Sequence, residues 1–212
     1  MLAPRLSVCI PAHAAAFPLL RRTLLSFAAQ TNRDFEVVVA IDGPGQFRVP
    51  DVPYPLAFIR TPRTDSPLPH RNHARNAAAK VAAGELLWFV DADFLWDAHT
   101  VEHLLQADHT PLSPILVSTR RYRLGRGVVV EETPEPMPEG FPLVRKADFV
   151  GFDERFLGRG GNKESFVTTL QDYRLLASAR GYHQPHHRET QPEALTDHNR
   201  DMYEAAGGKV WR

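Results

Sequence analysis

The stretch that most constrains the fold is an unbroken apolar run, Leu86–Val90, which two aspartates, Asp91 and Asp93, follow directly. Its length and composition predict a strand buried on both faces, as in the middle of a parallel sheet. Residues two apart on an extended chain point the same way, so both carboxylates are expected on one side where the strand ends. Carboxylate oxygens suit Mg²⁺ and Mn²⁺, which often share a substrate's phosphate oxygens. We therefore predict a site for a metal and a diphosphate at this end of the strand.

Strand-like and helix-like patterns alternate along the first half of the chain. Apolar runs predict strands, and small or apolar residues at helical spacing predict the helices between them. This alternation indicates an α/β fold in which helices flank a mostly parallel central sheet. A later amphipathic pattern predicts a helix over Glu164–Arg180, capped by Gly181. The expected strands are Leu6–Pro11, Phe35–Ile41, Leu56–Arg60, Leu86–Val90, Ile115–Tyr122 and Val128–Glu131, and the other expected helices are Pro18–Gln30, His70–Ala83 and Thr100–Gln106.

Length and composition limit the classes of protein to which the chain can belong. The 212 residues are enough for one substantial core, so a single domain over residues 1–212 is the simplest organisation. The formal net charge is zero, which implies no bulk attraction to nucleic acid or to an acidic membrane. No apolar run approaches the length of a membrane span, and no signal-peptide pattern follows Met1. The single cysteine, Cys9, excludes a disulfide framework, so a cytoplasmic protein is expected.

The residues just before the apolar strand form a composite motif. Residues 70–76 read His-Arg-Asn-His-Ala-Arg-Asn, a helix of small residues follows, and Ala-Gly-Glu at 83–85 leads into the strand and its Asp-Ala-Asp. In this order and spacing the chain resembles the donor-binding half of family 2 glycosyltransferases, which have the GT-A fold. The proline of the first strand, and Asp42 with Gly43 after the second, also resemble the opening of that family. The resemblance implies a nucleotide-sugar-binding half over residues 1–100 and an acceptor-binding half over residues 101–212.

The resemblance also implies a role for each matching residue on the donor side. A loop after the first strand touches the nucleoside, and an acid after the second strand binds the base or ribose. Two arginines one helical turn apart face the diphosphate. A divalent cation, Mn²⁺ or Mg²⁺, would neutralise the charge that develops on the diphosphate as it leaves. The expected donor-side residues are Pro11, Asp42, Arg71, Arg75 and Asp91, with Asp93 as the direct metal ligand and Asp91 as a second candidate ligand.

A second motif lies in the C-terminal half. Residues 151–161 resemble the acceptor-side motif of galactosyltransferase-like and N-acetylgalactosaminyltransferase-like members. An acidic pair normally follows, but this chain has Asn-Lys at 162–163, and Glu164 comes next. The base that takes the acceptor's proton is therefore expected to be Glu164 or, failing that, Asp153 or Glu154. Glu164 would equally suit the first turn of a helix, where an acid interacts favourably with the helix dipole.

Histidines near the C-terminus are candidates for a third metal ligand. Many GT-A enzymes take such a ligand from a histidine after the last helix, and His186 or His187 has that place in chain order. Imidazole suits Mn²⁺ better than Mg²⁺. The alternative is a polar tail with exposed histidines that bind nothing.

The expected function is metal-dependent transfer of a sugar from a nucleotide-diphosphate donor, in the first instance a UDP-sugar, to an acceptor hydroxyl. Two alternatives stay open. One is a sugar nucleotidyltransferase on a similar fold, although residues 11–14 lack the Gly-rich basic loop that such enzymes carry after the first strand. The other is a non-catalytic module that binds nucleotide or carbohydrate, which the missing acidic pair would explain.

Overall fold

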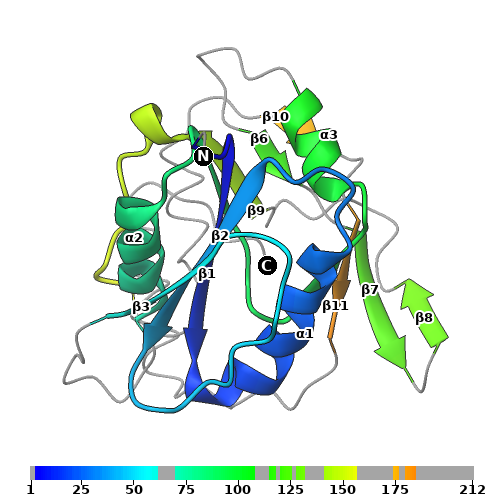
Figure 1. Ribbon diagram of the computed structural model, residues 1–212, viewed down its shortest axis with the longest axis horizontal. Helices are drawn as coiled ribbons and strands as arrows, with labels where there is room; N and C mark the ends of the chain where they lie inside the picture. Colours follow the sequence, from blue (N-terminus) through cyan, green and yellow to red (C-terminus); the bar gives the residue numbers. More distant parts are fainter. Residues whose placement is uncertain are drawn as a thin grey trace, which may run out of the picture.

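A computed structural model describes residues 3–61, 70–107, 115–117, 120–125, 128–131, 141–156, 174–176 and 180–184 of the chain. Within these ranges seven strands form one large sheet (Figure 1), in the order β10 (Arg174–Leu176), β6 (Ile115–Val117), β9 (Phe141–Arg145), β4 (Leu86–Phe89), β1 (Leu6–His13), β2 (Phe35–Asp42) and β3 (Leu56–Arg60). The four strands from β4 to β3 pair in parallel, and β9 lies antiparallel between β4 and β6. The predicted α/β fold with a mostly parallel sheet is confirmed.

A smaller sheet begins where the chain turns back after β4. Among the described residues its strands follow the order β5 (Phe94–Trp96), β11 (Arg180–His183), β7 (Arg120–Gly125) and β8 (Val128–Glu131). β11 pairs antiparallel with β5 and parallel with β7. Residues 90–93 therefore connect β4 of the large sheet to β5, the first strand of the small one.

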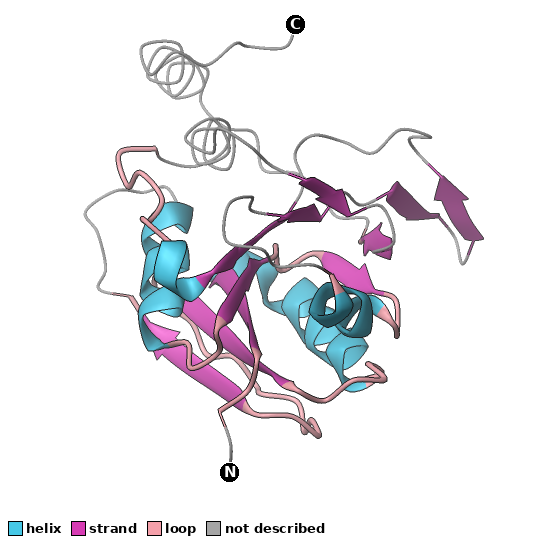
Figure 2. Cartoon of the chain, turned by 90° about the horizontal axis from the view of Figure 1, so that it is seen from above, coloured by secondary structure: helices cyan, strands magenta, loops and turns pink. Residues whose placement is uncertain are grey.

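Helices cover both faces of the large sheet (Figure 2), with α1 (Phe17–Ala28) and α3 (Thr100–Gln106) on one face and α2 (Arg71–Val81) on the other. Alternate residues of the central strand face the two layers. Leu86, Trp88 and Val90 join the core cluster on the α1 face, whereas Leu87 and Phe89 join the cluster on the α2 face. All five side chains are at most 6% exposed. The prediction that this run is buried on both faces is therefore confirmed.

The closeness of α2 to the sheet follows from its small residues. Ala74, Ala78 and Ala79 are buried against Cys9 of β1 and Val38 of β2. Alanine has high helix propensity and a short side chain, so it supports the helix and lets its backbone approach the strands. Two short 3₁₀ helices, η1 (Ala14–Ala16) and η2 (Lys146–Asp148), complete the described helical elements. No helix in the described ranges has both the length and the apolar character that crossing a membrane would need.

An aromatic cluster joins the strands before and after the turn that follows β4. The ring centroids of Trp88 and Trp96 lie 4.5 Å apart, and the Phe141 ring lies 4.7 Å from Phe94 and 5.1 Å from Trp96. Aromatic pairs of this kind contribute about 0.5–1.5 kcal/mol each beyond their buried area. The rings come from β4, β5 and β9, so the cluster joins the small sheet to the large one.

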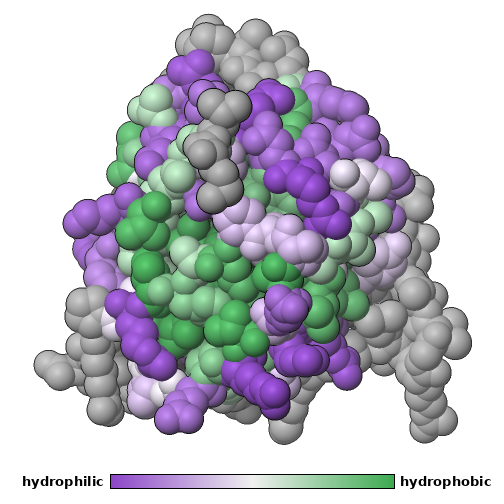
Figure 3. Space-filling model, in the orientation of Figure 1, coloured by the Kyte–Doolittle hydropathy of each residue, from purple (hydrophilic) through white to green (hydrophobic). Residues whose placement is uncertain are grey.

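The connection between β2 and β3 packs its own apolar residues onto the domain. The Phe47 ring lies 5.2 Å from Phe17 at the start of α1 and 5.4 Å from Phe58 on β3. Val49, which follows, is 51% exposed. Figure 3 shows apolar side chains gathered in the middle of this face, with polar residues around them.

The predicted helix over Glu164–Arg180 is wrong in its described part. Residues 174–176 form β10, which pairs in parallel with β6, and Arg180 begins β11. Gly181 lies within β11, opposite Trp96 of β5, and so it does not cap a helix. Pairing with strands far away in the sequence overrides the local helical spacing here, as is common for short strands.

Two strand predictions also change, and two strands were missed. β1 continues past Pro11 to His13, because β4 pairs with β1 only as far as Cys9 and the missing proline N–H breaks no ladder on that side. The predicted strand over Ile115–Tyr122 is two strands, β6 and β7, which belong to different sheets. β5 and β9 were not predicted.

Truncating Trp88 to alanine should destabilise the domain by about 3–5 kcal/mol, because the side chain is fully buried and the cavity removes its aromatic contacts. The measurement is urea unfolding followed by circular dichroism. The matched control is Val150→Ala, at a position 81% exposed, which should change the free energy of unfolding by less than about 0.5 kcal/mol. Equal effects of the two changes would contradict the assignment of Trp88 to the core.

Candidate active site

The two aspartates lie on a turn at the carboxyl end of β4. Val90 extends the pairing of β4 with β1 by donating its N–H to the carbonyl oxygen of Cys9 at 3.1 Å, and β5 begins at Phe94. Ala92 is 6% exposed, whereas Asp91 and Asp93 are partly exposed on either side of it. The backbone of the turn is therefore buried while both carboxylates stay within reach of a ligand.

Arg75 on α2 holds the first of these carboxylates. Its side chain is 2% exposed, and its Nη2 donates to Oδ1 of Asp91 at 3.1 Å. Nη1 donates to the side-chain oxygen of Asn72 at 2.8 Å, and the guanidinium lies 5.4 Å above the ring of Phe152. A charge buried this deeply needs a close counter-charge and hydrogen bonds, and Asp91 and Asn72 supply them. Arg75 was predicted to face a diphosphate, and in the structure its guanidinium forms an ion pair with Asp91.

Asp42 ends β2 at the same edge of the sheet. In the pairing of β1 with β2 it lies opposite His13, the last residue of β1. Its Oδ2 accepts the backbone N–H of His70 at 2.6 Å, directly before the first turn of α2. The carboxylate is thereby fixed between the end of the strand and the start of the helix.

Arg71 opens α2 one helical turn before Arg75. It is partly exposed, and it makes no hydrogen bond or ion pair with the residues that the structure describes. The first turn of α2 carries no acid. A helix N-terminus attracts anions through its unpaired N–H groups and its dipole, and an uncommitted arginine strengthens that attraction.

The predicted acceptor-side segment is docked on α2 through two asparagines. The amide of Asn76 binds both backbone groups of Phe152, accepting its N–H at 2.8 Å and donating to its carbonyl at 2.9 Å. Asn72 donates to the carbonyl oxygen of Asp153 at 2.8 Å. The Phe152 ring packs edge-on against Phe89 of β4 with centroids 4.8 Å apart. Residues 151–156 are thus joined to the same helix that holds Asp91.

The two acids of this segment are held ionised by their neighbours. Hydrogen bonds from Arg155 lower the pKa of Asp153, outweighing the partial burial that acts in the opposite direction. For Glu154, burial acts to raise the pKa, but hydrogen bonds with Asn76 at 2.8 Å and His73 at 2.9 Å outweigh it and the pKa is lowered. Both carboxylates are therefore weak bases with committed oxygens.

The chemistry of the turn fits a divalent cation that shares oxygens with a bound ligand. Asp91 and Asp93 offer the carboxylate oxygens that Mg²⁺ and Mn²⁺ prefer. Within the described ranges no group of three or more His, Cys, Asp or Glu side chains is placed to hold a metal on its own. Phosphate oxygens or other residues would have to complete the coordination.

The structure brings most of the predicted donor-side residues to one edge of the sheet. Pro11 is buried in β1 two residues before that strand ends, Asp42 ends the neighbouring strand β2, and Asp91 and Asp93 follow β4 on the other side of β1. Arg75 reaches this edge from α2, which Arg71 opens. Three predicted site residues lie outside the described residues: Glu164, His186 and His187.

Four polar residues with contacts in this region were not predicted. Asn72 and Asn76 stand inside the motif at 70–76, and the spacing of Asn72 to Arg75 and to Asn76, three and four residues, could have indicated that Asn72 neighbours both on the helix surface. Thr23 binds the carbonyl oxygen of Ala92, and Gln184 binds that of Asp93. Neither of these two has a local sequence signal, because their partners lie 69 and 91 residues away.

The sequence and the fold match known proteins. A family model described as glycosyl transferase family 2 matches residues 7–167. A crystal structure of S. aureus TarS 1–349 in complex with UDP-GlcNAc aligns with a TM-score of 0.69 at 18% identity, covering 95% of this chain and 66% of that one. The same part of TarS in complex with UDP aligns with a TM-score of 0.60 at 18% identity, covering 85% of this chain and 60% of that one. A search of curated proteins found no match.

A longer TarS chain shows how much of such a protein this chain covers. Its crystal structure aligns with a TM-score of 0.60 at 18% identity over 85% of this chain, but only 37% of that chain is covered. At this identity the likeness concerns the fold. The chain thus spans little more than a third of that TarS chain.

Replacing Arg75 by methionine should destabilise the protein by about 3 kcal/mol, because it leaves Asp91 and the Asn72 amide without their buried partner. The matched control is Arg155→Met, which breaks an ion pair whose arginine is 78% exposed and should change the free energy of unfolding far less, because solvent screens such a pair. Urea unfolding measures both. Equal costs would contradict a buried, structurally committed Arg75.

Glu154→Gln should weaken the protein at neutral pH by less than about 1 kcal/mol, since the Glu154 side chain is 47% exposed. Because the folded-state pKa lies below the ordinary value of 4.5, the stabilisation is present above pH 4.5 and is lost as the pH falls through the lowered pKa. The difference between wild type and variant in urea unfolding should therefore shrink on acidification below that value. A difference that grows there would contradict the contacts with Asn76 and His73.

Proposed function

The chain belongs to glycosyl transferase family 2, and on this premise we propose that it transfers a sugar from a UDP-linked donor to an acceptor hydroxyl with Mn²⁺ or Mg²⁺. The observation that carries the proposal is the turn at residues 91–93. It presents two carboxylates at the carboxyl end of a buried central strand, and Arg75 orients one of them. Ligands of open α/β sheets bind at that end of the strands. The complexes of TarS with UDP and UDP-GlcNAc support a donor of this class.

The nucleoside would lie across the ends of β1 and β2. Asp42 is held at this edge by the His70 N–H and offers its carboxylate to the base or ribose. Pro11 would line the floor beneath the nucleoside, because it is buried in β1 close to the same edge. Arg71 has no partner among the described residues and would bind a phosphate through its planar guanidinium.

The diphosphate would be held at the turn by Asp93, assisted by Asp91. A divalent cation bound there would stabilise the negative charge that develops on the leaving diphosphate. Gln184 donates its backbone N–H to the carbonyl oxygen of Asp93 at 2.8 Å, and His186 and His187 follow it two and three positions later in the sequence. An extended chain spans about 3.3–3.6 Å per residue, so either imidazole could reach the turn as a third ligand.

In the transfer itself, the acceptor oxygen forms a bond to the anomeric carbon of the sugar. The bond from that carbon to the diphosphate oxygen breaks, UDP leaves with the electron pair, and the hydroxyl proton passes to a carboxylate. Asp153 and Glu154 remain candidates for this base, but their oxygens are committed to Arg155, Asn76 and His73. These contacts favour Glu164 as the base.

The cytoplasm is the location that we propose for this reaction. The single cysteine, Cys9, is buried and free in the core of the large sheet. Burial raises the pKa of its thiol far above the ordinary value, so the thiol is poorly reactive. A free thiol and no disulfide framework suit a reducing compartment.

A binding module without transfer activity is the second candidate. Two observations favour it: the Asn-Lys that stands at 162–163 in place of an acidic pair, and the committed oxygens of Asp153 and Glu154. Such a module would bind UDP tightly and release none from UDP-GlcNAc with any acceptor offered.

Replacing Asp93 by asparagine should lower Mn²⁺-dependent UDP release from UDP-GlcNAc about 100-fold or more, because the change removes the carboxylate that holds the charge-neutralising cation. The matched control is Asp97→Asn, which makes the same substitution four residues later. Its side-chain oxygen accepts the His99 N–H at 3.1 Å, and an asparagine oxygen can replace it there. Release that persists in the Asp93 variant would contradict the proposed metal site, and UDP binding without release in wild type would favour the module.

A further inference from the structure

Two buried polar side chains lie against the backbone of the turn at 91–93. Thr23 comes from α1 and Gln184 directly follows β11, and both are fully buried. Gln184 lies beyond residue 167, where the match to the family model ends. Neither residue has a part in the donor or acceptor contacts proposed above.

The two side chains form a relay that ends on the turn. The Gln184 amide Nε2 donates to Oγ1 of Thr23 at 3.1 Å, and Oγ1 of Thr23 donates to the carbonyl oxygen of Ala92 at 2.7 Å. Nε2 also donates to the carbonyl oxygen of Leu19 at 3.1 Å, which ties the amide to α1. Hydrogen bonds in a dry interior polarise and strengthen one another, so the relay fixes the Ala92 carbonyl firmly.

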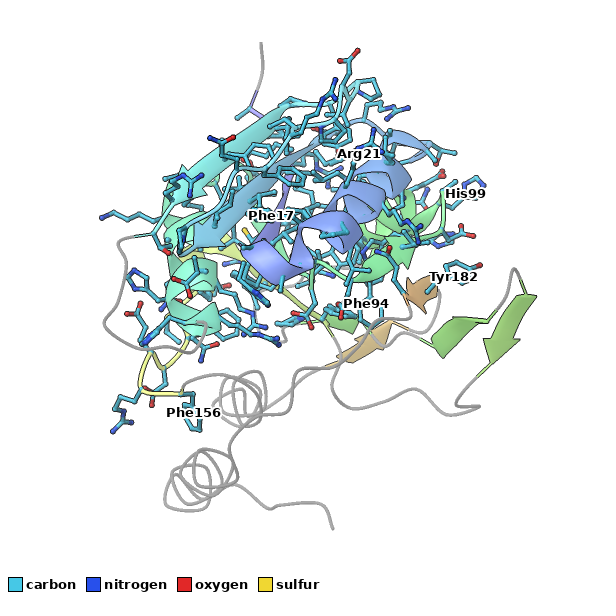
Figure 4. All side chains as sticks on the ribbon, turned by 90° about the horizontal axis from the view of Figure 1, so that it is seen from below. Phe17, Arg21, Phe94, His99, Phe156 and Tyr182 are labelled. Atoms are coloured by element: carbon cyan, nitrogen blue, oxygen red, sulfur yellow. The ribbon has the colours of Figure 1, made fainter. Side chains whose placement is uncertain are left out.

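The backbone of Gln184 holds the next carbonyl of the same turn. β11 pairs with β5 so that Tyr182 lies opposite Leu95 and His183 opposite Phe94. Figure 4 shows Phe94 and Tyr182 on these neighbouring strands beside α1. The bond from the Gln184 N–H to the Asp93 carbonyl, at 2.8 Å, continues this ladder by one residue. The carbonyl groups of Ala92 and Asp93, which flank the Cα of Asp93, are therefore both fixed by hydrogen bonds.

We propose that Thr23 and Gln184 are positioning residues that hold the backbone of Asp93 so that its carboxylate meets the metal in the correct place. This inference rests on the proposed function, because it needs Asp93 to be a metal ligand. Residues that do not touch the metal but hydrogen-bond to a metal-binding residue and orient it typically change metal affinity about 10- to 100-fold when they are removed. The same bonds hold Gln184, which precedes His186 by two positions in the sequence, beside the turn.

A purely structural role is the alternative, and α1 offers a matched control for it. Ser26, one turn further along the helix, accepts the backbone N–H of Trp96 at 3.2 Å and donates to the carbonyl oxygen of Thr23 at 2.7 Å. It therefore binds β5 through a hydroxyl, as Thr23 binds Ala92, without touching residues 91–93. Loss of either hydroxyl should affect folding, but only the loss at Thr23 should displace Asp93.

The experiment measures Mn²⁺ affinity directly, by the electron paramagnetic resonance signal of free Mn²⁺ titrated with protein in the presence of UDP. Thr23→Val keeps the shape of the side chain and removes the hydroxyl, and it should weaken Mn²⁺ binding about tenfold. Thr23→Ser restores the hydroxyl and should bind as wild type does, and so should Ser26→Ala. Gln184→Met, which removes the amide but keeps its length, should weaken binding as Thr23→Val does, and it carries the same test if Thr23→Val does not fold.

The outcomes separate this inference from the proposed function. If wild type binds no Mn²⁺ with UDP, the proposed metal site itself fails. If wild type binds and neither Thr23→Val nor Gln184→Met weakens the affinity, the positioning role is overturned while the metal site stands. An equal loss in Ser26→Ala would overturn it too, because the effect would then follow from general loosening of α1.

Discussion

The buried guanidinium of Arg75 is the constraint on which the site depends. It joins Asp91 at the end of the central strand, Asn72 on its own helix and the ring of Phe152 in the segment that follows β9. A buried charge keeps its place only while all its partners keep theirs, so these three parts of the chain are fixed together. The helix that would face the donor therefore also docks the segment predicted to face the acceptor.

Features set by local pattern could be predicted from the sequence. The unbroken run Leu86–Val90 indicated burial on both faces because no polar residue interrupts it, and its side chains do alternate between the two cores. The bounds predicted for β3 and α3 match the structure, since each has clear spacing and clear flanking signals. The family also followed from the motif at 70–76 and the Asp-Ala-Asp, because the spacing of these residues reflects one helix packed against one strand.

Features that depend on distant partners could not be predicted. The helical spacing near residue 175 gave no sign that this segment would pair with β6, about 60 residues earlier. The motif identified Arg75 as a candidate site residue but not the direction of its guanidinium, which Asp91 and Phe152 decide. Thr23 and Gln184 are 161 residues apart, and each alone reads as an ordinary polar residue. Side-chain hydrogen bonds of this kind can be identified only from the folded structure, in which the two sheets bring distant residues together.

The most direct measurement is a crystal structure of the protein with UDP and Mn²⁺, in which anomalous scattering locates the ion. We expect the ion at the Asp93 carboxylate beside the diphosphate, with Asp91 still bound to Arg75 and the base or ribose on Asp42. An ion bound elsewhere, or UDP bound away from the carboxyl end of β4, would contradict the central claim that the turn at residues 91–93 binds a metal and a diphosphate.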